Sequence, residues 1–128
     1  MSQSPEDLLR SFELQATEHA ERARELGERI EQISATVQSA GGEVRVTVDS
    51  TGGLSSLAFG SPARGIALDQ LAELVIQSSR QAQARLAASI GELVSQVYGP
   101  GSETANFVSR TYAERFPTPE ANEDGKSR

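Results

Sequence analysis

The segment formed by residues 43–59 constrains the fold of this chain most strongly. Residues 43–49 alternate apolar and polar side chains and are rich in valine, a pattern typical of a strand with one buried and one exposed face. Gly52 and Gly53 follow, and glycine tolerates the positive φ angles of a tight turn. A second short strand is indicated by Leu54, Leu57 and Phe59. The segment therefore predicts a β-hairpin.

A long helix is predicted before the hairpin. Ser4 can cap its start, Pro5 suits the first helical position, and two acids follow where the helix dipole favours them. A helix over residues 5–33 would be roughly 43 Å long at about 1.5 Å per residue. Spacings of three and four residues define a heptad seam along it, formed by Leu9, Phe12, Ala16, His19, Ala23, Leu26, Ile30 and Ile33.

The polar face of this helix carries acids and arginines rather than a recognisable metal-binding motif. An acid precedes an arginine by four residues in the pairs Glu6–Arg10, Glu18–Arg22 and Glu25–Arg29, which favours ion pairs. The glutamates could instead form a carboxylate site, but the interleaved arginines favour a solvated face. His19 is the only histidine and the chain has no cysteine, so we expect His19 to pack in the seam and predict no metal and no cofactor.

A three-stranded antiparallel meander is predicted between two long helices. Residues 35–40 indicate a first strand, Gly41 and Gly42 a turn, and the strands lie near residues 35–40, 43–49 and 54–60. Such strands extend only about 20 Å, roughly half the length of each helix. Both helices would overhang the sheet, and a second copy of the chain is the simplest cover.

The second helix begins at Leu68 and ends before Gly99-Pro100-Gly101. Its seam, with an average spacing near 3.6 residues, consists of Leu71, Val75, Ser79, Ala82, Leu86, Ile90, Leu93 and Val97. A short helix opening near Ser102 is predicted to carry on one side Phe107, Val108, Tyr112 and Phe116. These side chains either pack back onto the dimer or dock another protein.

The chain resembles the YbaB/EbfC family of bacterial nucleoid-associated DNA-binding proteins. A long charged helix is followed by Gly42-Glu43-Val44-Arg45-Val46-Thr47-Val48-Asp49 with Gly52-Gly53-Leu54, and then by a helix that opens with residues 68–75. The resemblance covers roughly residues 6–97. Residues 78–80 depart from it, because Ser-Ser-Arg stands where alanine-rich versions are usual, and residues past 99 have no counterpart in the short family members.

This resemblance implies an α+β subunit of order α-β-β-β-α in an intertwined homodimer whose helices project like tweezers. It also implies binding of double-stranded DNA with little sequence preference, in the cytoplasm at the nucleoid. We expect this domain over residues 1–99, a short amphipathic helix over residues 100–116 and a disordered tail over residues 117–128. The expected dimer interface consists of Leu9, Phe12, Leu26, Ile30, Leu86, Ile90 and Leu93.

Arginines are the expected DNA contacts, although the chain is acidic. Residues 1–37 carry eight acids and four arginines, so the first helix as a whole repels a duplex. Binding would need arginines that a dimer brings together. Arg80 and Arg85 of the second helix are the first choice because the first helix offers its arginines glutamate partners. Further candidates are Arg22, Arg24 and Arg29 of the first helix and Arg45 of the sheet.

Other functions have weaker support in the sequence. No phosphate-binding loop, dinucleotide motif or nucleophile elbow is present, so we expect no enzyme and no catalytic residue. No apolar run approaches the roughly 18–20 residues that span a bilayer, so no membrane partner is expected. The rival hypothesis is a cytosolic adaptor on the same scaffold, for example in actinobacterial secretion, which does not bind DNA and binds another protein through Phe107, Tyr112 and Phe116. A secreted helical hairpin of the WXG type would need a tryptophan, which the chain lacks.

Overall fold

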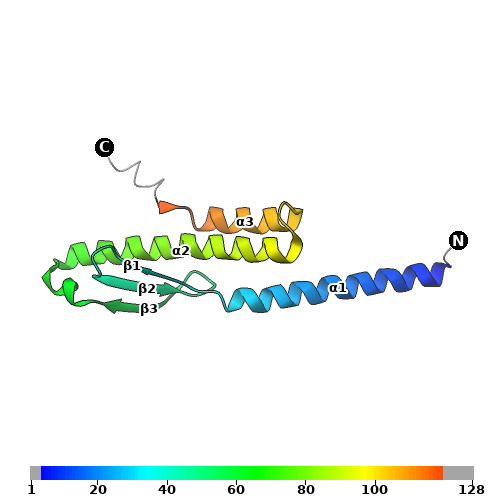
Figure 1. The fold of residues 1–128 in the computed structure, drawn as a ribbon, viewed down its shortest axis with the longest axis horizontal. Helices are drawn as coiled ribbons and strands as arrows, with labels where there is room; N and C mark the ends of the chain where they lie inside the picture. Colours follow the sequence, from blue (N-terminus) through cyan, green and yellow to red (C-terminus); the bar gives the residue numbers. More distant parts are fainter. Residues whose placement is uncertain (1–3, 120–128) are drawn as a thin grey trace.

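The computed structural model describes residues 4–119 and has an α+β fold (Figure 1). Its elements are α1 (Pro5–Glu31), β1 (Ala35–Gln38), β2 (Val44–Val48), β3 (Leu54–Phe59), the 3-10 helix η1 (Ser61–Gly65), α2 (Leu68–Tyr98) and α3 (Glu103–Arg115). The strands form one antiparallel sheet in the order β1-β2-β3. The predicted α-β-β-β-α pattern is confirmed, with slightly shorter strands. Most of the tail predicted to be disordered lies outside the described residues.

The central strand β2 has its apolar side chains on one face. Val44, Val46 and Val48 are buried, whereas Arg45 between them is exposed. The β2–β3 turn that follows requires a glycine, because Gly52 has a φ of 88°, in the left-handed region that other residues rarely adopt. The alternation along β2 therefore defines which face of the sheet belongs to the core.

Helix α2 packs across β1 and β2 and supplies more of the buried apolar side chains than any other element. Leu86 and Ile90 are completely buried, and Leu93 is nearly so. The same chain thus already removes these three side chains from water, which leaves them little surface for the expected dimer interface. The buried serine of α2 is Ser78, while the predicted Ser79 is only partly buried.

Helix α3 lies alongside the half of α2 that extends beyond the sheet (Figure 1). Ala105 is buried in this contact, and Tyr112 and Phe116 pack against the core. Phe107 does not join them, because it is 62% exposed on the outer side of α3. Phe107 lies about 200° around the helix from the buried Ala105, at about 100° per residue. The prediction that it shares one side of the helix with the other apolar residues is therefore wrong.

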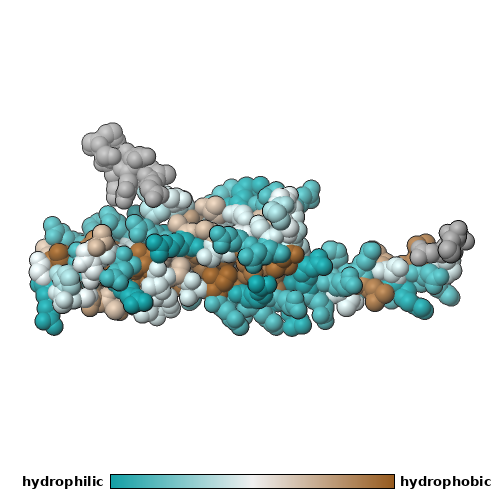
Figure 2. Space-filling model, viewed as in Figure 1, coloured by the Kyte–Doolittle hydropathy of each residue, from teal (hydrophilic) through white to brown (hydrophobic). Residues whose placement is uncertain are grey.

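Helix α1 projects away from the rest of the molecule (Figure 1). Leu26 is its only buried residue, and Ile30 is partly buried against the core. Leu9 and Phe12 are exposed by 62% and 68%. Figure 2 shows apolar surface near the free end of α1 and again beside the C-terminal half of α2. The outer part of the predicted seam is thus uncovered in a single chain.

Candidate nucleic-acid interface

The two arginines of α2 lie on different sides of the helix. Arg85 follows Arg80 by five positions, which places them about 140° apart around the helix at about 100° per residue. Arg85 is exposed and its Nη1 donates a hydrogen bond of 3.1 Å to the main-chain oxygen of Thr36 in β1. Arg80 is also exposed. The helix therefore presents two separate cations, and one of them is held against the edge of the sheet.

The arginines of α1 have different partners from those predicted. Arg24 Nη1 lies 2.9 Å from Glu28 Oε2, the only ion pair within residues 4–119. The predicted ion pairs Glu6–Arg10, Glu18–Arg22 and Glu25–Arg29 are not formed. The guanidinium carbon of Arg22 instead lies 6.0 Å from the ring centroid of Tyr98, a cation–π arrangement.

A single chain does not bring all predicted arginines together. Arg22 lies beside Tyr98, and Tyr98 is thirteen residues beyond Arg85, or about 20 Å along the helix. The α1 arginines and the α2 arginines are therefore two groups rather than one patch. A duplex carries phosphates along its whole length, one charge per about 1.7 Å of axis, so a ligand of that kind could contact both groups.

The negative charge is concentrated in the projecting helix. Residues 1–37 carry eight acids and four arginines, whereas residues 38–119 carry seven acids and six arginines. The body formed by the sheet, α2 and α3 is thus nearly neutral. An anionic ligand would meet less repulsion on this body than on α1.

Two arginines of α3 belong to the same body and were missed by reasoning from the sequence. Arg110 and Arg115 are exposed, and the guanidinium carbon of Arg115 lies 5.4 Å from the ring centroid of Phe116. Periodicity alone could not place them, because it does not show that α3 docks on α2.

The open face of the sheet offers one further cation. Arg45 is exposed there, opposite Gln38 in β1 and Ala58 in β3. The hydroxyls of Thr36 and Thr47 share a hydrogen bond of 2.8 Å on the same face. This face is polar and carries one positive charge per chain.

The carboxylates of Asp49 and Glu43 accept hydrogen bonds within turns, and these bonds lower their pKa values. Hydrogen bonds from the Thr51 hydroxyl and main-chain N–H lower the pKa of Asp49. A hydrogen bond from the Ser39 hydroxyl lowers the pKa of Glu43. Each carboxylate bonds to residues of its own turn, so both groups fix local structure.

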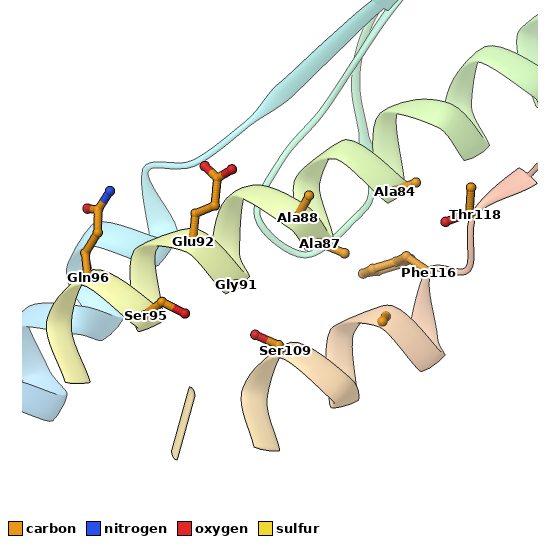
Figure 3. A pocket seen from close by; sticks show the side chains of 11 residues that line it. Ala84, Ala87, Ala88, Gly91, Glu92, Ser95, Gln96, Ser109, Phe116 and Thr118 are labelled. Atoms are coloured by element: carbon orange, nitrogen blue, oxygen red, sulfur yellow. The ribbon is translucent and has the colours of Figure 1, made fainter. Parts of the chain in front are cut away.

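A groove of about 640 Å³ runs between α2 and α3 (Figure 3). Small side chains line most of it, and the ring of Phe116 points toward Ala87 of α2. Of its lining, Glu92 alone carries a titratable side chain. No group of three or more acidic or histidine side chains within residues 4–119 could hold a metal ion, and His19 is exposed on α1.

The outer strand of the sheet has an uncovered apolar face. Phe59, Leu57 and Leu54 pair with the buried valines of β2, so they share the core face of the sheet. They are nevertheless exposed by 53%, 41% and 49%, because α2 packs on β1 and β2. On the neighbouring part of α2, Leu68 and Ile76 are exposed as well.

Comparison with known proteins supplies the family. None of the helices in the described part of the chain is long and apolar enough to cross a membrane. No curated protein matches the chain. The model of the YbaB/EbfC DNA-binding family matches residues 9–101, from the projecting helix through α2, and α3 lies outside the match. The chain therefore belongs to the YbaB/EbfC family, a nucleoid-associated DNA-binding family.

Proposed function

We propose that two copies of this chain associate and bind duplex DNA in the cytoplasm, at the nucleoid, with little sequence preference. Membership of a DNA-binding family supports the ligand. The uncovered apolar face of β3 supports the association and is the observation on which the proposal rests most directly. No catalytic step is part of this function.

Strand β3 is the surface through which we propose that the copies meet. It is an edge strand, and an exposed apolar edge is a template for pairing with another strand. A symmetric contact would place the same patch of both chains together. Leu57 and Phe59 would then be covered, whereas the buried Leu86 and Ile90 would take no part. Leu9 and Phe12 of the projecting helix are exposed and remain proposed contacts with the second copy.

DNA would be bound through exposed arginines of the body. Arg80 and Arg85 remain the first candidates, and Arg110 and Arg115 of α3 join them because they lie on the same nearly neutral unit. Arg22, Arg24 and Arg29 would be secondary contacts, since acids surround them and Arg24 is already paired with Glu28. Few cations per chain imply weak binding, and the affinity should fall as salt rises because the contacts are to phosphates.

A titration of a labelled duplex by fluorescence anisotropy tests this proposal. At about 50 mM salt the wild type should bind in the micromolar range, as non-specific DNA binders do. The double variant Arg80→Ala/Arg85→Ala should bind about tenfold more weakly on duplexes of any sequence, with a shallower dependence on salt. The matched control Arg10→Ala/Arg64→Ala removes the same charge from positions outside the proposed contacts. No binding by the wild type, or equal losses in both variants, would contradict the proposal.

An adaptor function is the second candidate, and the exposure of Phe107 favours it. A large apolar side chain on the outside of α3 is suited to contact another protein. Tyr112 and Phe116 are less suited, because they are partly buried against the core. Phe107→Ala should abolish capture of a protein partner in a pull-down. A pure DNA binder would capture no such partner and should keep its DNA affinity in this variant.

A further inference from the structure

The outer face of α3 carries a stripe of exposed side chains. Its members are Glu103, Phe107, Arg110 and Glu114. They lie within about 60° of one another, opposite the buried Ala105, at about 100° per residue. Spacings of four, three and four residues are those with which one helix meets another along its length. The inner face of α3 lies on α2, so this stripe faces away from the body (Figure 1).

The stripe is better suited to a protein partner than to DNA. Phe107 is exposed by 62%, and a large apolar side chain in water favours contact with an apolar partner. The charges beside it are two acids and one arginine, a balance from which a duplex would gain little.

The order of these charges selects a second copy in one direction. A parallel pair of α3 helices would place Arg110 against Arg110 and each acid against its own equivalent, which is unfavourable. In an antiparallel pair with Phe107 facing its equivalent, Arg110 faces position 104 of the other copy. Glu103 is only one residue away, or about 1.5 Å along the axis. Two-fold symmetry forms this pairing of Arg110 with Glu103 twice.

We propose that the α3 helices of two copies pair antiparallel through Phe107, with reciprocal ion pairs between Arg110 and Glu103. The contact would join different pairs of chains, since β3 is the surface proposed to hold each pair together. Pairs bound to DNA would thereby connect two duplexes, with Arg115 left to contact DNA. This consequence rests on the proposed function, whereas the contact itself requires no DNA. Because α3 lies outside the residues that the family model matches, the contact adds a surface to the family domain.

The contact should be weak. A stable interface buries about 800 Å² per partner from roughly 20–30 residues, whereas α3 has 13 residues and offers one face of them. Exposed ion pairs add little affinity and mainly select the orientation. We expect pairing at about 0.1–1 mM protein in free solution, and at lower concentration where DNA holds pairs of chains close together.

Sedimentation of the full chain between about 10 μM and about 1 mM tests the contact without DNA. The average mass of the wild type should rise toward twice its value in dilute solution. Phe107→Ala should keep the dilute mass over this range. The control Leu14→Ala, which truncates an exposed apolar side chain of α1, should behave as the wild type does. No rise in the wild type, or a rise that survives Phe107→Ala, would overturn the inference.

Reversing the charges tests the antiparallel register. Arg110→Glu and Glu103→Arg each oppose like charges, so each should shift the rise in mass to about tenfold higher concentration. The double variant Glu103→Arg/Arg110→Glu restores opposite charges and should recover the wild-type curve. Arg64→Glu makes the same charge change at an exposed position of η1 and should have no effect. A double variant that associates no better than the single ones would rule out these ion pairs and the proposed register.

A bridging assay separates this inference from the proposed function. At about 50 mM salt, wild-type protein on a bead-bound duplex should retain a second, labelled duplex from solution. Phe107→Ala should bind the bead-bound duplex equally well but retain about tenfold less label. Equal retention by both proteins would overturn the connection of duplexes through α3. A protein that doubles its mass but binds no DNA would keep the α3 contact and remove the proposed function.

Discussion

The ring of Phe116 at the end of α3 packs against Gly52 in the β2–β3 turn. A β-carbon added at Gly52 would lie 2.7 Å from Cε1 of Phe116. Gln83 of α2 donates a hydrogen bond of 2.8 Å to the main-chain oxygen of Gly52. One turn thus receives contacts from both α2 and α3, and it connects the segment outside the family match to the sheet.

Gly52→Ala should destabilise the protein through backbone strain and a clash with Phe116. The positive φ alone costs about 1–2 kcal/mol for a residue with a β-carbon. We expect thermal unfolding followed by circular dichroism to show a clear fall in the midpoint. Gly65→Ala is the control, because nothing lies within 4 Å of an added β-carbon there. Phe116→Ala in the Gly52→Ala background should relieve the clash but not the strain. Equal midpoints for Gly52→Ala and Gly65→Ala would contradict both the strain and the clash at Gly52.

Ile90→Ala should lower the free energy of unfolding by about 2–5 kcal/mol, because it leaves a cavity in the core. Ile90 is completely buried within one chain. Phe107→Ala removes a larger side chain from an exposed site and should change the stability by about 0.5 kcal/mol or less. Denaturant unfolding of both variants measures the difference. If Ile90→Ala keeps its secondary structure and loses little free energy of unfolding, Ile90 does not lie in a closely packed core.

Asp49→Asn should weaken the β2–β3 turn in a pH-dependent way. Hydrogen bonds from Thr51 lower the pKa of Asp49 below its ordinary value of 3.8, so the carboxylate stabilises the fold above that value. This stabilisation is lost as the pH falls through the lowered pKa. We expect the wild type to melt above Asp49→Asn at pH 7 and the gap to close in acid. A gap that is independent of pH would exclude the charged hydrogen bonds as its cause.

Leu57→Lys should dissociate the proposed dimer. A charge placed on the apolar face of an edge strand opposes pairing with a second copy. Leu14→Lys on α1 is the control, because Leu14 is also exposed but lies outside β3. Light scattering should give the single-chain mass for Leu57→Lys and twice that mass for the control. If both variants keep the wild-type mass, β3 is not the contact.

The sequence predicted local structure well because local signals determine it. Alternation over residues 43–49 gave β2 its buried face, and Ser4 accepts a hydrogen bond from Asp7 at the start of α1 as a cap does. The breaker after Tyr98 ends α2 where predicted. In each case the signal and the structure that it specifies lie within a few residues of one another.

Tertiary partners could not be predicted in the same way. The apolar spacing of Leu86 and Ile90 identifies a buried face, but periodicity does not say whether the same chain or a second one covers it. Glutamate precedes arginine by four residues at Glu25 and Arg29, yet the pair that forms is Arg24 with Glu28, because exposed ion pairs contribute little and do not dictate rotamers. The docking of α3, which brings Arg110 and Arg115 onto the body, depends on contacts distant in sequence.

Sedimentation velocity of a dye-labelled duplex mixed with the protein at about 50 mM salt measures both the association of two chains and their binding to DNA. If pairs of chains bind duplex DNA of any sequence, the duplex should sediment faster. The complex should exceed the duplex in mass by two chains of 13.7 kDa each or by a multiple of that pair. The protein alone should sediment as a pair of chains. A duplex that sediments as if free, beside a protein that sediments as a folded single chain, would contradict the proposed function.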